Sequence, residues 1–403
     1  MTRRFLRMAI LLGLITAVGP FAIDMYLPAL PSMGKSLGAS AGAVQMSLMV
    51  FFIVIGICQL FYGPLSDIVG RKPPIYGGLA IFIIGSIGCA FAPGIEALIG
   101  FRVIQAFGAC AGMVIPRAIV RDLHTGHDAT RLMSLLMLTV SVSPILAPLT
   151  GSFVIGAFGW RGVFGVLAIA AALAFLLAAT QLKETRPPEE RRQSSWRGAF
   201  SAYGTLLRDG EFTGLVLVGA LGVSSFFVYL GSASFVLINH YGLTPRLFSL
   251  CFALNAASFF GFSQLTGTLT QRFGLPRVVR VAASGFALSM VALAAIFAGG
   301  ADNLFALMVP LFIGYGFLGL VIPTTAVLAL EHHGAIAGTA SALMGSIQMI
   351  VGSAIMALAG LFANGDPQPM AYGIAGCAIA AFLVTQFALK RVSAGAAASP
   401  SFP

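Results

Sequence analysis

Residues 184–195 read E-T-R-P-P-E-E-R-R-Q-S-S, a charged stretch with two adjacent prolines. Such a stretch cannot lie in the hydrocarbon of a membrane, where charges are costly and every backbone polar group needs a partner within the protein. It lies in a hydrophilic segment, residues 183–210, that has six long apolar segments before it and six after it. We therefore predict a linker, with room for a short surface helix, between an N-terminal half (1–182) and a C-terminal half (211–403).

A helix that spans a bilayer needs about 20 predominantly apolar residues. Twelve segments qualify, at approximately residues 8–30, 44–62, 75–91, 98–116, 132–155, 163–182, 212–238, 247–269, 281–298, 304–330, 338–363 and 370–389. The chain is 58% hydrophobic and 9% charged, whereas a soluble domain is about 45–50% apolar and 25% charged. These observations predict an all-α membrane protein with twelve transmembrane helices.

The basic residues predict the orientation of these helices. With the N-terminus inside, nineteen of the 23 Lys and Arg residues fall on the inner side, three in outer loops, and Arg102 in a membrane segment. The positive-inside rule then places both termini and the linker in the cytoplasm. We expect the membrane to be a bacterial inner membrane. Topology thus explains the net charge of +10, so no nucleic-acid partner is expected. We interpret the first segment as a membrane helix and not a signal peptide, because it contains Asp24 and lacks a cleavage site.

A short internal repeat supports two related halves. Residues 63–72, after the second segment, read G-P-L-S-D-I-V-G-R-K, and residues 267–276, after the eighth, read G-T-L-T-Q-R-F-G-L-P. The first Gly, the Leu, the polar fifth position and the second Gly align without gaps. The eighth segment is the second of its half, so the repeat predicts two pseudo-symmetric six-helix bundles.

Two ionisable residues lie inside predicted membrane segments, where each is a functional candidate. Asp24 in the first segment and Arg102 in the fourth both lie about 6–10 Å below the outer surface, at 1.5 Å per residue. Equal depth permits an ion pair if the two helices are neighbours. Pro28 has no N–H, so the carbonyl of Asp24 loses its helical partner and a kink is expected beside the acid.

This pair suggests how proton transfer could be coupled to transport. Loss of hydration disfavours the charge of a buried carboxyl group, and a nearby guanidinium favours it. Separating Asp24 from Arg102 would therefore let the carboxyl take up a proton, and restoring the pair would expel it. The alternative is a static ion pair that holds the two helices together.

The segment after the second helix has the features of a conformational latch on the cytoplasmic side. We expect Gly63 to allow close approach where the helix ends, and Gly70 to support a tight turn. Asp67 can reach Arg71 if this segment is helical, and Lys72 follows. The alternative is that these charges only set the topology.

Residues 63–73 resemble the loop 2–3 motif of the major facilitator superfamily, and Arg102-x-x-Gln105-x-x-Gly108 resembles its helix 4 motif. Residues 22–31, A-I-D-M-Y-L-P-A-L-P, are similar to the first helix of drug:proton antiporters of the Bcr/CflA family. The resemblance covers the whole twelve-helix layout and is sharpest in the first half.

This resemblance implies the major facilitator fold, two six-helix bundles that rock between inward-open and outward-open states. It implies that Asp24 is the acid linked to protons and to polar or cationic substrate groups, and that Arg102 is the coupling arginine. Asp67 and Arg71 would form the latch.

The antiporter motif of helix 5, G-x-x-x-G-P-x-x-G-G, is only partly present. Pro148 and Gly151 match it, but Ser143 and Ala147 stand at its first two glycines. The small residues still allow close helix packing, and the motif favours export. The alternative is a proline-bent packing helix with no further role.

Other polar and aromatic residues of the membrane segments are candidates for lining a substrate cavity, although isolated residues of these types often only connect helices. They are Tyr26, Gln45, Gln59, Phe227, Tyr229, Asn239, Asn255, Gln264, Tyr315 and Gln348.

No metal site is expected, because the histidines at 124, 127, 332 and 333 lack Cys or carboxylate neighbours at zinc-binding spacing. No P-loop or hydrolase motif occurs in the sequence. We therefore predict a monomeric transporter, not an enzyme, that exports small amphipathic compounds and uses the proton gradient without a cofactor. The alternatives are an exporter of a metabolite or amino acid, and a membrane receptor or enzyme on the same scaffold.

Overall fold

The computed structural model describes residues 3–124, 126–191, 195–363 and 365–398. Eleven helices among these residues are long and apolar enough to cross a membrane. One of them, Asp128–Gln181, is long enough for two crossings and is interrupted at Gly159, whose φ of 68° is not helical. The described residues thus contain twelve membrane spans, as predicted.

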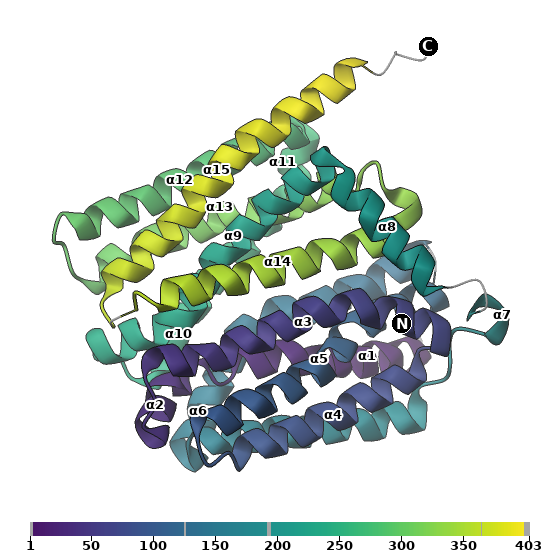
Figure 1. The fold of residues 1–403 in the computed structure, drawn as a ribbon, viewed down its shortest axis with the longest axis horizontal. Coiled ribbons are helices and arrows are strands. Elements are labelled where there is room, and N and C mark those ends of the chain that lie inside the picture. Colours follow the sequence, from purple (N-terminus) through teal and green to yellow (C-terminus); the bar gives the residue numbers. More distant parts are fainter. Residues whose placement is uncertain (1–2, 125, 192–194, 364, 399–403) are drawn as a thin grey trace. The chain divides into compact units, whose positions relative to one another are not determined.

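The first compact unit consists of residues 1–200 and 237–253. Its helices pack in a recurring set of pairs, α1 on α5 and α6, α3 on α5, and α4 on α5 and α6. Their bounds are α1 Arg3–Asp24, η1 Leu27–Ala29, α2 Leu30–Leu37, α3 Ala41–Val69, α4 Lys72–Ala90, α5 Ile95–Leu123 and α6 Gly126–Gln181. The predicted linker contains two short helices, α7 (Pro188–Arg191) and α8 (Trp196–Arg208), and its residues 192–194 lie outside the described residues (Figure 1).

The second compact unit consists of residues 201–236 and 254–403. In it α9 packs on α13, α14 and α15, and α12 packs on α13 and α15. The helices after the linker are α9 Gly210–Ser234, the π-helix η2 Phe235–His240, α10 Pro245–Ser263, α11 Thr266–Phe273, α12 Leu275–Ala298, α13 Leu304–Leu330, η3 Gly334–Ile336, α14 Ala337–Gly360 and α15 Pro367–Ala398.

The same helix pairs recur in the two units. In the second unit the first span packs on the fourth, fifth and sixth, and the third packs on the fourth and sixth. In the first unit the first and third spans both pack on the fourth, α5, and on α6, which contains the fifth and sixth. The predicted pseudo-symmetric six-helix bundles are therefore confirmed.

Small residues allow the helices of each unit to approach closely. A Cβ added to Gly108 of α5 would collide with the carbonyl of Gly78 and the backbone of Phe82 on α4. Similarly, a Cβ added to Gly319 of α13 would collide with the carbonyl of Phe259 on α10. Between helices surrounded by lipid, such close packing replaces the hydrophobic driving force that operates in water.

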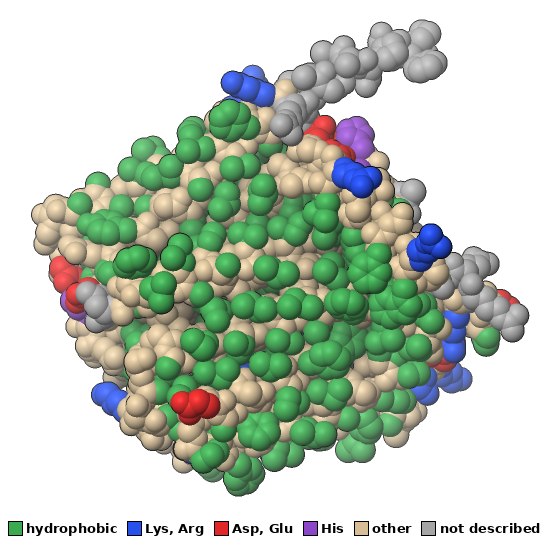
Figure 2. All heavy atoms as spheres, viewed as in Figure 1, with side chains coloured by type: hydrophobic (Ala, Val, Ile, Leu, Met, Phe, Trp, Pro, Cys, Tyr) green, Lys and Arg blue, Asp and Glu red, His purple; other side chains and the backbone are tan. Residues whose placement is uncertain are grey.

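The outward surface of the spans is apolar, the reverse of a soluble protein. Ile84, Phe153 and Leu288 are 59%, 59% and 73% exposed. Figure 2 shows hydrophobic side chains spread over the surface of the long helices. A surface of this kind is stable when lipid covers it.

The helix boundaries differ from the prediction at two places that bear on function. The second apolar segment was predicted to end near Tyr62, but α3 continues to Val69. The eighth segment was predicted as one helix, but it divides into α10 and α11 around Gln264 and Leu265. Ser66 and Asp67 therefore lie within α3, beyond its apolar run, and Gln264 lies at a break between two helices.

Candidate functional site

The first membrane span breaks at its buried acid. Helix α1 ends at Asp24, and a short 3-10 turn at Leu27–Ala29 separates it from α2. Pro28 lies in this turn and cannot donate a backbone hydrogen bond, which explains the break. The side chain of Asp24 is buried, with the residue 5% exposed. The predicted kink beside the acid is confirmed.

Helix α6 supplies the partner of this carboxyl group. The Ser143 hydroxyl donates to Oδ2 of Asp24 at 3.4 Å. Gly151 allows α6 to lie close at this level, because a Cβ there would collide with the carbonyl of Met25. Ser143 stands where the antiporter motif has a glycine, so the departure from the motif places a hydroxyl group on the acid. The other matched residue, Pro148, accepts a hydrogen bond from Ser249 through its carbonyl at 2.8 Å.

Arg102 of α5 is completely buried in an aromatic cage. Its guanidinium carbon lies 4.0 Å from the ring centre of Phe51, 4.4 Å from that of Tyr26 and 6.0 Å from that of Phe164. A cation held over aromatic faces is stabilised by the ring quadrupoles, most strongly when water is excluded. Tyr26, one of the cavity candidates, is 0% exposed and forms one wall of this cage.

Polar contacts fix the orientation of Arg102. Nη1 donates to the Ala22 carbonyl at 3.1 Å and to Oε1 of Gln105 at 2.7 Å, and Nε donates to the Ser47 carbonyl at 3.4 Å. Gln105 in turn donates to the Ser86 hydroxyl at 2.8 Å. The guanidinium thus connects α1, α3 and α5, and Gln105 connects it to α4.

The predicted ion pair between Asp24 and Arg102 is absent among the contacts of the described residues. Arg102 is instead bound to α1 through the carbonyl of Ala22, two residues before Asp24. Its Nη2 is buried and has no hydrogen-bond partner among the described residues. The two charged groups therefore belong to neighbouring helices of one bundle, and one donor of the guanidinium is unused.

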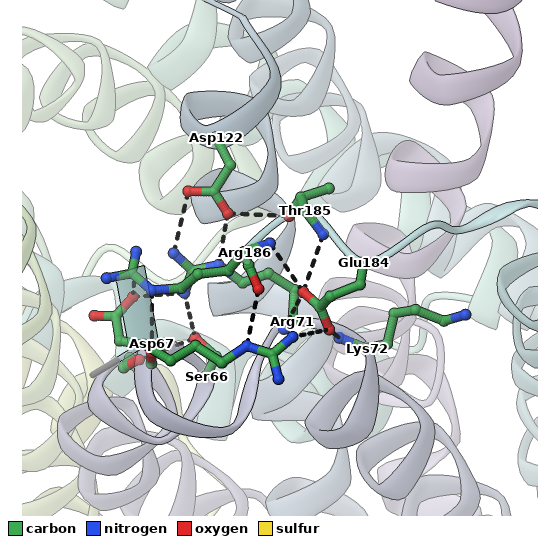
Figure 3. A network of polar contacts seen from close by, with 10 residues as sticks. Ser66, Asp67, Arg71, Lys72, Asp122, Glu184, Thr185 and Arg186 are labelled. Atoms are coloured by element: carbon green, nitrogen blue, oxygen red, sulfur yellow. Dashed lines mark hydrogen bonds and ion pairs between the residues drawn. The ribbon is translucent and has the colours of Figure 1, made fainter. Parts of the chain in front are cut away.

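A second polar cluster surrounds Arg71 at the end of α3 (Figure 3). Its guanidinium pairs with Asp67 at 2.7 Å and with Asp122 at 2.8 Å, and Nη1 donates to the Ser66 hydroxyl at 2.7 Å. The pair with Asp67 has the predicted i, i+4 spacing, but it does not form within one helix, because α3 ends at Val69 and Gly70 turns the chain between the two residues. Burial alone would lower the pKa of Arg71, but hydrogen bonding and charge from Asp122 and Asp67 outweigh it and raise the pKa.

Glu184, the first acidic residue after α6, holds the start of α4. Its carboxylate accepts the backbone N–H of Arg71 at 2.9 Å and that of Lys72 at 3.2 Å. Partial burial raises the pKa of Glu184, but these donors and the N–H groups of Arg186 and Thr185 outweigh it and lower the pKa. Glu184 is therefore charged at neutral pH, where it caps the positive end of the α4 dipole.

Neighbouring linker residues add contacts to the same cluster. Thr185 donates to Asp122 at 3.0 Å, and Arg186 donates to the Asp67 carbonyl at 3.0 Å. Arg186 also lies 3.5 Å from the Asp67 carboxylate, and Arg191 lies 3.5 Å from that of Glu184. The linker is thus fastened to the end of α3 and the start of α4 (Figure 3).

The two glycines of this cluster differ in their roles. Gly70 has a φ of 98° and ends α3 in the tight turn that was predicted, and a Cβ there would collide with Glu184 and Arg191. The expectation for Gly63 was wrong. Gly63 lies inside α3, and nothing lies within 4 Å of a Cβ added there.

Several cavity candidates of the second unit are buried in an aromatic and polar cluster. Asn255 donates to the Tyr229 hydroxyl at 3.0 Å, and the Tyr315 hydroxyl donates to the Ser225 carbonyl at 3.4 Å. The rings of Tyr229 and Tyr315 are 5.6 Å apart. Oδ1 of Asn255 is buried and has no partner among the described residues. This cluster provides one unused acceptor.

The other cavity candidates are spread over different environments. Phe227 is buried against Gly352, Gln45 is buried, Gln59 and Gln348 are half-buried, and Asn239 and Gln264 are exposed. Two cavities of about 630 and 370 Å³ lie in the second unit, and none of the predicted cavity residues lines either of them. The assignment of substrate-contacting residues stays a prediction.

A sequence model of the Major Facilitator Superfamily matches residues 12–357. The chain belongs to the major facilitator superfamily. The superfamily membership predicted from the loop 2–3 and helix 4 motifs is thereby confirmed.

Relatives within the superfamily match most of the chain. It is 36% identical over 360 residues to the uncharacterized MFS-type transporter YdgK of Bacillus subtilis, covering 88% of this chain and 89% of that protein. It is 31% identical over 359 residues to Multidrug resistance protein D of Escherichia coli, covering 88% of each. The resemblance to drug exporters of the superfamily is therefore confirmed. The solved structure of a D-xylose-proton symporter covers 94% of this chain and 95% of its own, with a TM-score of 0.73 and 18% identity, and this likeness shows the fold alone.

Several residues that contact Asp24, Arg102 or Arg71 could not be recognised as site residues from the sequence. Asp122 and Glu184 are each the first acid after an apolar segment, a position that gives no indication of a contact with Arg71. Ser86 and Ser143 are single hydroxyl groups inside apolar segments, and no local pattern distinguishes them from hydroxyls that bond their own helix. Ser86 does bond its own helix, through the Phe82 carbonyl, and it also accepts from Gln105 of α5, whereas Ser143 donates to Asp24 of α1.

We expect Glu184→Gln to weaken the attachment of the linker to the loop 2–3 motif. The neutral amide retains one acceptor oxygen for the N–H groups of Arg71 and Lys72, but loses the charge that strengthens these bonds. The thermal midpoint in detergent should fall by a few degrees and efflux should decrease several-fold. Glu189→Gln, an exposed change on α7 that removes the same charge, is the control. Equal behaviour of the two variants would contradict the assigned role.

Proposed function

We propose that the chain is a proton-coupled exporter of small amphipathic compounds, including drugs, that works by alternating access. It would act as a monomer in a bacterial inner membrane with both termini in the cytoplasm. The proton gradient would supply the energy, with no bound metal or cofactor. Membership of a transporter superfamily and the similarity to Multidrug resistance protein D support this proposal.

The observation that carries the proposal is the buried carboxyl group at the break of α1. Asp24 has a hydroxyl group as its partner and no counter-ion among the described residues. Arg102 lies on an adjacent helix with an unused donor, Nη2. A membrane protein retains such a costly group where it binds a substrate or moves a proton.

The geometry supports a simple cycle of proton binding and release. Movement of α1 that brings Asp24 to Nη2 of Arg102 would stabilise the carboxylate and expel its proton. Return of Asp24 to Ser143 would separate the charges and let the carboxyl take up a proton. If these two arrangements face opposite sides of the membrane, each turnover moves a proton inward while the substrate moves outward.

The polar cluster around Arg71, here called the loop 2–3 cluster, would stabilise one of the two states of the transport cycle. Arg71, Asp67, Asp122 and Glu184 form a network of charge-assisted bonds that must be kept or broken as a unit. Such a network makes one arrangement of the helix ends distinctly more stable than intermediate ones. It therefore favours switching between two states over gradual deformation.

Proton release from inverted membrane vesicles tests the proposal. With a pH gradient imposed and followed by a pH-sensitive dye, an exported amphipathic compound should dissipate the gradient only in vesicles that contain the protein. Competition by metabolites and amino acids in the same vesicles separates drug export from the alternative of metabolite export. If no compound of a broad panel causes proton release by correctly folded protein, the proposal is overturned.

A further inference from the structure

Helix α8 follows the linker and is strongly amphipathic. At 100° per residue, Tyr203 and Leu206 lie on one edge of its apolar face, and both are buried. Trp196, Phe200 and Leu207 lie beside them within a 40° arc and remain 37%, 46% and 53% exposed. The helix thus uses only one edge of its apolar face for packing against the protein.

The next strip around α8 is basic. Arg197 and Arg208 lie about 100–120° from Trp196 on the helical wheel, and both are exposed. Neither forms an ion pair among the described residues, and the sequence of α8 contains no acidic residue. Buried apolar, exposed apolar and basic strips therefore follow one another around the helix. Figure 2 shows Lys and Arg side chains beside hydrophobic ones on the surface over α8.

Contacts with a membrane span join the exposed apolar strip of α8 to the exposed surface of that span. The ring of Phe61 lies 6.2 Å from that of Trp196 and 5.9 Å from that of Phe200. Phe61 belongs to the span Ala41–Val69 and is itself 43% exposed, as part of the apolar surface of that span. The strip on α8 continues this surface, with a tryptophan at its edge. Tryptophan is enriched where the apolar part of a membrane meets water.

We propose that α8 lies along the cytoplasmic membrane surface and binds the headgroups of acidic phospholipids through Arg197 and Arg208. Trp196, Phe200 and Leu207 enter the acyl boundary, and the two guanidinium groups lie at the level of the phosphates. Each arginine near an anionic bilayer surface strengthens association by about fivefold. The inference rests on the cytoplasmic orientation of the linker and not on proton coupling.

Quenching of Trp196 by brominated lipids tests this proposal. The chain has two tryptophans, so Trp160→Phe leaves Trp196 as the only one. The full-length variant is reconstituted in bilayers of fixed phosphatidylglycerol content, in which either the phosphatidylglycerol or the phosphatidylcholine carries bromine. We expect the relative association constant for phosphatidylglycerol at Trp196 to be at least about fivefold higher than for phosphatidylcholine.

Charge variants in the same background identify the residues responsible. Arg197→Gln with Arg208→Gln should abolish the preference, and Arg197→Lys with Arg208→Lys should retain it. Arg277→Gln with Arg280→Gln removes the same charge from exposed positions on α12 and should leave the preference unchanged.

Three results would overturn the proposal. Equal quenching by both lipids would show no headgroup selection, and a preference that survives the loss of both α8 arginines would place it elsewhere. Absence of quenching by either lipid would mean that protein, such as a second copy of the chain, covers this face.

Discussion

Replacement of Asp24 by asparagine is expected to abolish substrate-stimulated proton release while leaving the protein folded. The amide can still accept the Ser143 hydroxyl and has nearly the same volume, so packing at the end of α1 should be preserved. It cannot take up or lose a proton in the physiological range. Proton release from inverted vesicles should fall to that of vesicles without the protein, and size-exclusion profiles in detergent should match the unmodified chain.

Ser143→Ala provides the graded comparison for this result. It removes the hydroxyl partner but leaves the carboxyl group, so we expect reduced but measurable release, about three- to tenfold below the unmodified chain. Ser152→Ala on the same helix is the control, because the Ser152 hydroxyl donates to the Leu149 carbonyl of its own helix. Undiminished proton release by Asp24→Asn would remove Asp24 from the mechanism.

Replacement of Arg102 by alanine should have the second largest effect, on both stability and transport. It would leave the carbonyls of Ala22 and Ser47 without their donor and open a void between Phe51 and Tyr26. Loss of buried cation–π contacts and hydrogen bonds should destabilise the protein by on the order of 3 kcal/mol. Thermal midpoints and proton release should both fall, and release should reach the background level.

Arg102→Lys separates a coupling role from a static one. Lysine keeps the charge, but it lacks the planar group that stacks on two rings and donates in several directions. We expect a protein that folds, with a smaller loss of stability than Arg102→Ala, but that releases few protons per substrate transported. Normal coupling in folded Arg102→Lys or Arg102→Ala would indicate that Arg102 only holds α1, α3 and α5 together.

The number and type of helices could be predicted because they depend on local composition. A run of about 20 apolar residues is favourable in lipid only as a helix, whatever packs around it. The ends of the helices could not be predicted as well. Helix α3 extends seven residues past the predicted end at Tyr62 because Arg71, Asp122 and the linker stabilise polar turns outside the apolar run.

The contacts of the loop 2–3 cluster also differ in how far the sequence predicts them. The pair of Asp67 with Arg71 was predicted on the assumption of a continuous helix. The two residues do pair, but Gly70 ends α3 between them, so a tight turn and not the helical period brings their side chains together. The contacts of Arg71 with Asp122 and Glu184 join residues 51 and 113 positions apart. No periodicity connects such positions, so only the packing of α3, α5 and the end of α6 reveals them.

The sequence by itself determined the membrane spans, their pairing into two related halves, and the depth of Asp24 and Arg102, because the rise and periodicity of a helix are local properties. Only the tertiary structure decided what those two side chains contact. Arg102 of α5 binds the Ala22 carbonyl of α1 and the Phe51 ring of α3, and Asp24 of α1 binds Ser143 of α6. A helical pattern indicates that a face is buried, but the partners on that face come from residues far away in the chain.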